Sequence, residues 1–564
     1  MCGIVGYVGS QVPSSRPLEV ALNGLKRLEY RGYDSAGVAL VAPGVDRVVS
    51  AKKAGKLLNL TAELEAHPLA DATASIGHTR WATHGAPNDL NAHPHLADGG
   101  RLAVIHNGIV ENFAALRVEL AADGVTFLSE TDSEVAAHLL AKELAEAGDL
   151  TEAMRRTAVR LEGTFTLLAV HADRPDTVVG ARHDSPLVVG LGEGENFLGS
   201  DVAAFIAFTR EALELGQDQI ATITPDAVSV IDFEGTVVEP RRFTVDWDAE
   251  AAEKGGFASF MDKEIHDQPQ AVGDTLLGRT DLEGRLVLDD LRIDESVLRT
   301  VDKIVVIACG TAAYAGHVAK YAIEHWCRIP VEVELAHEFR YRDPVVNEKT
   351  LVVAITQSGE TMDTLMAVRH AREQGAKVIS IVNTHGSTIP RESDAVLYTH
   401  AGPEIAVAST KAFLSQITAA YLLGLYLAQL RGNMFPDEIA KIYDELREMP
   451  GKIQEVIDRG ARVREIARWM ADTSSVLFLG RHVGFPVAME GALKLKELAY
   501  IHAEGFAAGE LKHGPIALIE PGQAVFVIVP SPRGRHSLHS KVISNIQEIR
   551  ARGARTLVLA EDGD

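Results

Sequence analysis

A cysteine at the second position is the residue in this sequence whose place alone suggests chemistry. Cys2 follows Met1 directly, so removal of the initiator methionine would leave an α-amine beside the thiol. Such an amine, with a pKa of about 7.7 to 8.0, can accept the thiol proton and make one residue both nucleophile and base. The alternative is a small buried residue that starts a strand. The neighbouring residues have to decide between the two.

Four short motifs accompany this cysteine in the first quarter of the chain. They are RGYDSAG at 31–37, HTRWATHG at 78–85, HNGIVEN at 106–112 and SETDSE at 129–134. Together with Cys2 they resemble the class II glutamine amidotransferases, whose nucleophile is an N-terminal cysteine. The chain as a whole resembles the glutamine–fructose-6-phosphate aminotransferase family. This resemblance implies that the N-terminal part releases ammonia from L-glutamine.

The resemblance assigns roles to single side chains. Asn107 and the backbone amide of Gly108 match the oxyanion hole that thiolate attack on an amide requires. Arg80 matches the residue for the α-carboxylate of glutamine and Asp132 the residue for its α-amine. Trp81 matches a gate on an ammonia passage. Seen alone, these residues would be interpreted as a solvated arginine, an Asn-Gly turn, a helix cap and a core tryptophan.

Histidines crowd the same region and raise the question of a metal ion. Their spacing fits no usual zinc template, and the expected hydrolysis needs no metal, so none is expected. One of them, His84, is placed with the glutamine-binding residues. The five are His78, His84, His93, His95 and His106.

From residue 301 onward, apolar runs that suit buried strands alternate with helical patterns, as in KIVVIACG followed by AGHVAKYAIEHW. This alternation predicts parallel sheets covered by helices. The pattern also repeats, because Pro344 follows Gly310 by 34 residues and Pro515 follows Gly480 by 35. Two tandem copies of one α/β unit are therefore expected. They resemble sugar isomerase (SIS) domains.

The first copy contains a candidate phosphate site. In TLVVAITQSGETMDT a buried strand delivers hydroxyl residues to the start of a helix, where amides and the helix dipole can hold a phosphate. Hydroxyl residues at such turns are often only helix caps. Further hydroxyls at comparable ends of other elements favour a sugar-phosphate site. The candidate residues are Thr311, Thr356, Gln357, Ser358, Thr361, Val407 and Ser409.

Two further features bear on this site. Ala312 stands where some relatives carry serine, so one hydroxyl contact to the sugar or its phosphate is in doubt. The chain has neither a Walker A sequence nor a GxGxxG fingerprint, so no nucleotide cofactor is expected.

The second copy carries EGALKLKE, in which Glu490, Lys494 and Glu497 share one face of a helix. An ordinary salt-bridged surface would explain this spacing equally well. Converting a ketose phosphate into an aldose amine requires a base that moves a proton between neighbouring carbons. The resemblance assigns that role to Glu497, assistance at the sugar oxygens to Lys494, and ring opening to His513 from a partner subunit. It therefore implies a homodimer.

The expected fold is an α+β N-terminal-nucleophile amidotransferase domain at 2–226 and a connector at 227–294, followed by two α/β parallel-sheet SIS domains. The polar, charged stretch at 241–290 is expected to lie on the surface of its neighbours. The SIS domains are expected at 295–435 and 467–564. The second is expected to be incomplete, because the sequence ends just after ARTLVLA, its equivalent of the AKVISIVN strand in the first copy.

Composition limits the remaining possibilities. A formal net charge of −23 on 564 residues repels polyanions, so a nucleic-acid partner is not expected. Three scattered cysteines suit a reducing compartment. No signal peptide and no membrane span are apparent, and the protein is expected to be cytoplasmic, with no membrane partner.

The resemblance implies that L-glutamine and D-fructose 6-phosphate are converted into D-glucosamine 6-phosphate and L-glutamate, the first step of amino-sugar synthesis. Two alternatives remain open at this point. One is another class II amidotransferase, and the other is an SIS-based sugar-phosphate sensor.

Overall fold

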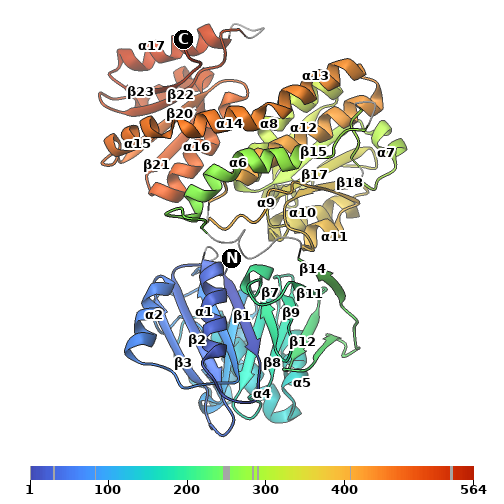
Figure 1. Ribbon diagram of the computed structural model, residues 1–564, viewed down its shortest axis with the longest axis vertical. Coiled ribbons are helices and arrows are strands. Elements are labelled where there is room, and N and C mark those ends of the chain that lie inside the picture. The colour runs from blue at the N-terminus through green and yellow to red at the C-terminus, as the bar shows by residue number, and fades with distance from the viewer. Residues whose placement is uncertain are drawn as a thin grey trace. The chain divides into compact units, whose positions relative to one another are not determined.

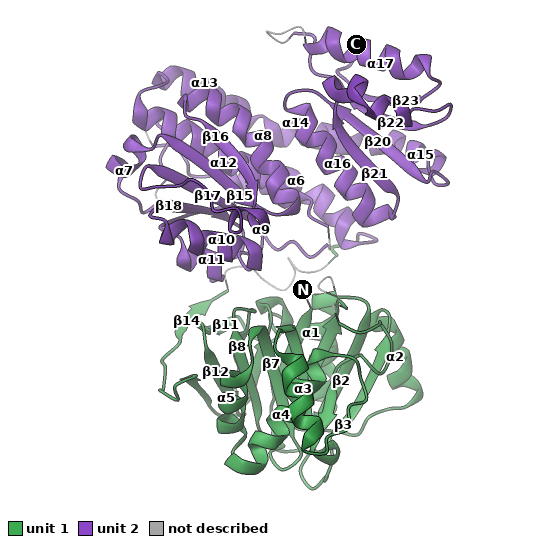
Figure 2. Ribbon diagram, turned by 180° about the vertical axis from the view of Figure 1, so that it is seen from behind, with its two compact units in different colours: residues 1–255 green, residues 256–564 purple. Residues whose placement is uncertain are grey.

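The computed structural model describes residues 2–29, 32–82, 84–245, 254–281, 285–288, 291–406, 408–533 and 538–563. The chain divides into two compact units, residues 1–255 and residues 256–564 (Figure 2). Each unit has sheets, helices and hydrophobic cores of its own, and most of the elements are labelled in Figure 1.

Unit 1 is built on two antiparallel sheets. The eight-stranded sheet has the order β14-β11-β9-β10-β1-β4-β2-β3. Its strands are β1 (Gly3–Val8), β2 (Ser35–Val41), β3 (Val49–Ala54), β4 (Ala74–Arg80), β9 (Val188–Leu191), β10 (Asn196–Gly199), β11 (Glu211–Glu214) and β14 (Arg241–Thr244). The six-stranded sheet has the order β13-β12-β8-β7-β6-β5. Its strands are β5 (His95–Ala97), β6 (Leu102–Val110), β7 (Gly163–His171), β8 (Val178–His183), β12 (Gln219–Ile223) and β13 (Val228–Asp232).

The sheets of unit 1 face each other across a buried core that includes Ile4, Ile76, Ile105 and Leu168. Helices cover both outer faces (Figure 1). Because both faces of β1 are covered, all six of its residues are buried and no polar alternation appears. The helices are α1 (Arg16–Leu28) and α2 (Leu57–Ala66) on the larger sheet, and α4 (Asp132–Ala147) and α5 (Leu150–Arg160) on the smaller one, with α3 (Phe113–Ala122) against α4.

Unit 2 begins with a five-stranded parallel sheet of order β16-β15-β17-β18-β19. Its strands are β15 (Lys303–Ala308), β16 (Val331–Leu335), β17 (Thr350–Thr356), β18 (Lys377–Val382) and β19 (Ala395–Tyr398). One face packs on α8 (Gly310–Cys327) and α12 (Lys411–Arg431), which α6 (Phe260–Leu276), α7 (Glu295–Thr300) and α13 (Pro436–Arg447) surround. The other face packs on α9 (Ala336–Phe339), α10 (Met362–Glu373) and α11 (Thr388–Glu392).

A four-stranded parallel sheet follows, with the order β21-β20-β22-β23. Its strands are β20 (Ser475–Gly480), β21 (His502–Ala507), β22 (Ala524–Ile528) and β23 (Arg555–Leu559). This order matches that of β16, β15, β17 and β18, which confirms the predicted repeat. The accompanying helices are α14 (Met449–Asp458), α15 (Gly460–Trp469), α16 (Gly484–Ala499) and α17 (Leu538–Ala551), with the 3-10 helices η5 (Ala508–His513) and η6 (Pro515–Leu518).

Helices α12 and α6 bear on two sequence-based expectations, and of the two only α6 differs from its expectation. Helix α12 is long and apolar enough to cross a membrane by length and composition, but 67% of that window is buried, as in the central helix of a packed core. Helix α6 lies in the segment expected on the surface. It nevertheless buries Glu264, Val272 and Leu276. The Glu264 carboxylate bonds to the backbone amide of Ile405 rather than to water, and the other two side chains belong to the hydrophobic core.

Candidate functional site

Cys2 lies immediately before β1, next to the end of β4. The two strands pair antiparallel with Gly3 opposite Thr79, which brings Trp81 to the cysteine. The Trp81 backbone N–H donates to Cys2 Sγ at 3.2 Å. Cys2 is half-buried, and this desolvation raises the pKa of its thiol, while the Trp81 amide acts in the opposite direction. A base or a bound substrate therefore has to favour the thiolate.

Strand β6 supplies the predicted oxyanion residues. Asn107 Nδ2 donates to the Cys2 carbonyl oxygen at 2.7 Å, so the amide lies directly beside the cysteine. Gly108 has a φ of +122°, and a Cβ there would collide with the Thr164 carbonyl on β7. Only glycine suits this position.

His78 on β4 fixes the orientation of Asn107. Its Nε2 lies 2.9 Å from the His106 carbonyl oxygen and 3.0 Å from Asn107 Oδ1. Both partners are acceptors, so Nε2 must carry the proton. Burial lowers the pKa of His78 to about 3, which makes the neutral Nε2–H tautomer the state at neutral pH. The sequence drew attention to His78 only as a possible metal ligand.

The histidines form a buried cluster around His78. The rings of His78 and His93 lie 4.1 Å apart, and those of His93 and His95 lie 4.8 Å apart. Burial lowers the pKa of His93 and His106 below the ordinary value, and that of His95 to about 3. Among the described residues, no group of three or more His, Cys, Asp or Glu side chains is arranged to hold a metal ion.

The residues predicted to bind glutamine lie around this cysteine in unit 1. The guanidinium Nη2 of Arg80 donates to the carbonyls of His84 and Gly85. Its Nη1 is buried without a hydrogen-bond partner in the part of the chain that the structure describes, so it can donate a hydrogen bond to a carboxylate oxygen. Asp132 begins α4, and its Oδ2 accepts the Val110 amide at 2.9 Å.

Two aromatic contacts complete the surroundings of Cys2. Trp81 is 43% exposed, with its ring edge-on to Tyr33 at 5.3 Å. The His84 ring lies 5.6 Å from Phe113. The indole of Trp81 is therefore not a core side chain, and its role as a gate stays a prediction.

Unit 2 contains a cavity of about 180 Å³ at the carboxyl ends of β15 and β17. Six of the seven predicted residues line it: Thr311, Thr356, Gln357, Ser358, Thr361 and Ser409. The seventh, Val407, lies outside the described residues. Three residues that the motifs did not indicate also line it: Cys309 just before α8, Thr364 on α10 and Gln416 on α12.

The loop between β17 and α10 has the geometry of an anion site. Gly359 has a φ of +68°, and a Cβ there would collide with the Ser387 hydroxyl, so the turn requires glycine. The Gly359 amide donates to Thr356 Oγ1 at 3.2 Å, and that oxygen lies 3.2 Å from Thr361 Oγ1. The loop ends at the N-terminus of α10, where free amides and the helix dipole favour a phosphate.

Thr311 connects this cavity to the Glu490 cluster on α16. Its hydroxyl donates to Glu490 Oε1 at 3.0 Å and accepts from Lys494 Nζ at 2.9 Å. Lys494 also binds Glu497 at 2.5 Å and lies 3.5 Å from Glu490. Burial raises the pKa of Glu490 to about 7, which Lys494 and Thr311 partly oppose. The two repeats thus share one polar network through α8 and α16.

Known proteins match the whole chain. A SIS domain model matches residues 297–426 and 470–564, and a glutamine amidotransferase domain model matches residues 78–207. The glutamine–fructose-6-phosphate aminotransferase [isomerizing] of Corynebacterium efficiens is 70% identical over 569 residues, covering 100% of this chain and 91% of the relative. The enzyme of that name from Streptomyces coelicolor is 66% identical with the same coverage. This chain belongs to the glutamine–fructose-6-phosphate aminotransferase family.

A solved structure agrees with this assignment of the aminotransferase. The C-terminal domain of glucosamine-fructose-6-phosphate aminotransferase from Francisella tularensis superposes with a TM-score of 0.53 at 39% identity, covering 55% of this chain and 85% of that structure. Family membership confirms the resemblance and the fold class predicted from the motifs, an amidotransferase domain followed by SIS domains. The roles of the single residues and the exact domain boundaries stay predictions.

His513 is the one predicted catalytic residue that stands apart. It ends η5 and is exposed, whereas Thr311, Glu490 and Lys494 lie within one hydrogen-bonded cluster. The His513 side chain is thus accessible from outside the chain.

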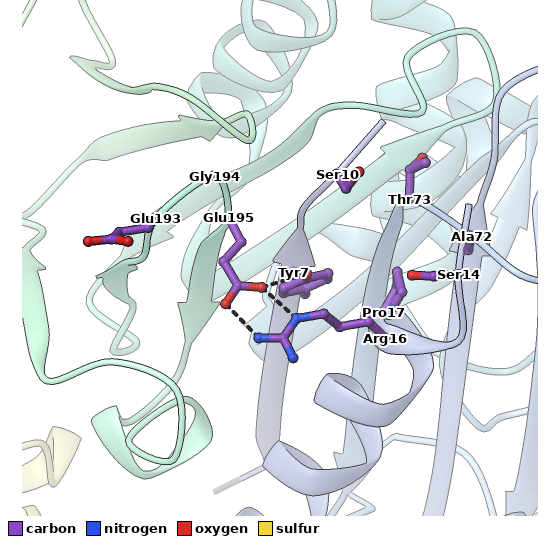
Figure 3. Close-up of a pocket in the computed structure, with 10 residues that line it drawn as sticks. All are labelled: Tyr7, Ser10, Ser14, Arg16, Pro17, Ala72, Thr73, Glu193, Gly194 and Glu195. Atoms are coloured by element: carbon purple, nitrogen blue, oxygen red, sulfur yellow. Dashed lines mark hydrogen bonds and ion pairs between the residues drawn. The ribbon is translucent and has the colours of Figure 1, made fainter. Parts of the chain in front are cut away.

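A larger cavity, of about 310 Å³, lies elsewhere in unit 1, between the start of α1 and the turn that joins β9 and β10 (Figure 3). Arg16 binds both carboxylate oxygens of Glu195, at 2.7 and 2.6 Å, and the Tyr7 hydroxyl donates to the same carboxylate at 2.7 Å. Glu193 points away from this group (Figure 3). Three polar side chains that line this cavity thus bind one another.

Proposed function

We propose that the chain converts D-fructose 6-phosphate and L-glutamine into D-glucosamine 6-phosphate and L-glutamate. Relatives as much as 70% identical over the full chain carry the name of this activity. The observation that carries the proposal is the presence of two complementary sites in one chain. Unit 1 places a thiol beside an oriented amide, and unit 2 joins a hydroxyl-lined cavity to a Lys–Glu cluster.

The glutamine half begins with attack of the Cys2 thiolate on the side-chain amide carbon. Asn107 and the Gly108 amide stabilise the tetrahedral oxyanion. The α-amine exposed by removal of Met1 takes the thiol proton and passes it to the leaving nitrogen. Collapse of this intermediate then expels ammonia and leaves a γ-glutamyl thioester, which water hydrolyses to glutamate and the free thiol. The free Nη1 of Arg80 holds the α-carboxylate of the substrate, and Asp132 holds its α-amine.

The sugar half consumes that ammonia. The loop before α10 holds the phosphate, and ammonia condenses with the ketone at C2, releasing water. Glu497 removes a proton from C1 of the resulting imine and returns it to C2. The O1 hydroxyl loses its proton and the nitrogen gains one, so that C1 becomes the aldehyde and C2 carries the amine. Lys494, which lies 2.5 Å from Glu497, stabilises charge on the sugar oxygens. His513 opens the sugar ring from a partner subunit, which makes the protein a homodimer.

No metal or redox cofactor takes part in these steps. They suit a cytoplasmic enzyme that supplies the first intermediate of amino-sugar synthesis.

The test is formation of glucosamine 6-phosphate from glutamine and fructose 6-phosphate by the purified protein, with glutamate measured in parallel. Cys2→Ala should abolish glutamine-driven synthesis, because the nucleophile is lost. Thr361→Val should raise the KM for fructose 6-phosphate and leave glutamate release unchanged. Glutamate release without amination of fructose 6-phosphate would instead indicate another amidotransferase. Binding of the sugar with no turnover of glutamine would indicate a sensor.

A further inference from the structure

Helix α6 presents a buried carboxylate to the loop that carries Ser409 into the sugar-phosphate cavity. Glu264 is 2% exposed. Its Oε1 accepts the backbone amides of Ile405 and Ala406 at 2.5 and 2.8 Å, and its Oε2 accepts the Thr410 hydroxyl at 3.2 Å. Three donors of this Ser409 loop (residues 404–406 and 408–410) thus converge on one side chain from a distant part of the sequence.

A second carboxylate holds the same loop from within. Glu404 Oε1 accepts the amides of Thr410 and Ala412 at 2.8 and 3.0 Å, and its Oε2 accepts the Ser409 hydroxyl at 3.0 Å. Those amides belong to the first turn of α12, so Glu404 caps that helix. The loop is therefore anchored on one side to α12 and on the other to α6.

Two further contacts keep α6 in place against the loop. Asp267 binds Lys411 at 3.1 Å, and the Lys411 side chain is only 4% exposed. The Thr275 hydroxyl donates to the Thr399 carbonyl, just beyond β19, at 2.6 Å. Helix α6 packs against α12 within unit 2. Helix α6 therefore contacts the chain on both sides of the Ser409 loop, at Thr399 and at Lys411.

We infer that Glu264 is a positioning residue for the sugar-phosphate site. It does not line the cavity itself; it fixes the Ser409 loop so that Ser409 reaches the cavity. A loop without this anchor would have to be ordered by the ligand, which weakens binding. The inference rests on the proposed function, because it takes fructose 6-phosphate as the ligand of this cavity.

The experiment compares the full-length protein with four variants. Glu264→Ala removes the acceptor, and Glu264→Gln keeps an acceptor for the two amides. Thr410→Val removes one donor and preserves the side-chain shape. Asp274→Ala is the matched control, because Asp274 lies on the same helix and binds Gln270 there at 2.6 Å. For each variant, calorimetry gives the Kd for fructose 6-phosphate, and kinetics give kcat, KM and the glutaminase rate.

We expect Glu264→Ala to raise Kd and KM for fructose 6-phosphate about tenfold, with kcat and the glutaminase rate within twofold of wild type. Glu264→Gln should restore most of the affinity, and Thr410→Val should weaken it about threefold. A Kd for Glu264→Ala or Thr410→Val equal to that of Asp274→Ala would overturn the inference, and Thr410→Val gives this answer if Glu264→Ala fails to fold. Wild-type protein that does not bind fructose 6-phosphate would instead overturn the proposed function, and the inference would fall with it.

Discussion

The side-chain amide of Asn107 has two orientations that differ by a flip, and only one turns Nδ2 toward the cysteine. The neutral Nε2–H of His78 donates to Oδ1 and so selects that orientation. An oxyanion donor is effective when it is already aligned before the reaction, because no free energy is then spent on turning it. We therefore expect His78 to contribute to hydrolysis without touching glutamine.

Replacing His78 should affect rate more than binding. We expect His78→Leu to lower kcat for glutamine hydrolysis about 100-fold, with little change in KM. This is the loss in kcat that removal of one oxyanion-hole donor typically causes. Because the pKa of His78 is about 3, the effect should be the same from pH 5 to 9. Glutamate release measures it, and His171→Leu, at a buried histidine that binds Asp98 instead, is the control. A kcat within threefold of wild type would contradict the role.

Gly108 makes a second prediction at this scale. With a φ of +122° and the Thr164 carbonyl in the way of a Cβ, Gly108→Ala should lower the free energy of unfolding of unit 1 by at least about 2 kcal/mol. Gly194 also has a positive φ, but nothing lies near its Cβ position. Gly194→Ala should therefore cost only about 1 kcal/mol. Urea unfolding distinguishes the two, and equal losses would show that the Thr164 contact is unimportant.

At the scale of elements, local patterns predicted what local physics controls. The apolar runs at 350–356 and 377–382 are buried strands, and the loop from Gln357 to Thr361 meets a helix start, as the sequence indicated. Residues close in the sequence determine these features, because strand burial follows from a run of apolar residues and the loop joins the end of one such strand to the next helix.

Features that depend on tertiary packing were missed. Gln416 lines the cavity from the first turns of α12, whose sequence suggests only an apolar core helix. Glu264 lies in a polar stretch that resembles a surface connector, yet its partners are backbone amides about 140 residues away. Side-chain polarity does not show whether a group bonds to water or to a distant loop. His78 was overlooked as a positioning residue for the same reason.

The buried charge of Glu264 also predicts a pH effect on stability. Burial raises the pKa of Glu264 to about 7, with Glu404 acting in the same direction and the Ala406 amide and Lys411 opposing it. Asp267 and Lys263 on the same helix pair with each other at 2.7 Å. Since an unfolded glutamate titrates near 4.3, the folded state holds a proton between about pH 4.5 and 7 that the unfolded state has lost. This contribution to stability therefore falls as pH rises through that window and is almost constant above it.

Glu264→Gln cannot lose a proton, so its stability relative to wild type should rise across the same window. The expected gain is about 3 kcal/mol between pH 4.5 and 7, with only about 0.4 kcal/mol more up to pH 8. Urea unfolding at four pH values measures it. If the difference in the free energy of unfolding between the two proteins stays constant with pH, the raised pKa of the buried Glu264 carboxyl is contradicted.

At the scale of the whole molecule, each unit carries its own closed core. The sheets of unit 1 enclose one apolar layer and bury two more under helices, and the first sheet of unit 2 is covered on both faces. A unit that satisfies its own hydrophobic surfaces can unfold as a cooperative body of its own. The two proposed chemical halves should therefore be separable by their thermal transitions.

Differential scanning calorimetry should accordingly show two transitions, each raised by a different ligand. Fructose 6-phosphate at 100 times its Kd stabilises the unit that binds it by about 2.7 kcal/mol, which raises that transition by several degrees. A glutamine analogue with an electrophile in place of the amide should raise only the other transition, and Cys2→Ala should abolish that second effect alone. A single transition whose temperature rises with either ligand would mean that the units unfold together, because a ligand bound to one unit would then stabilise both.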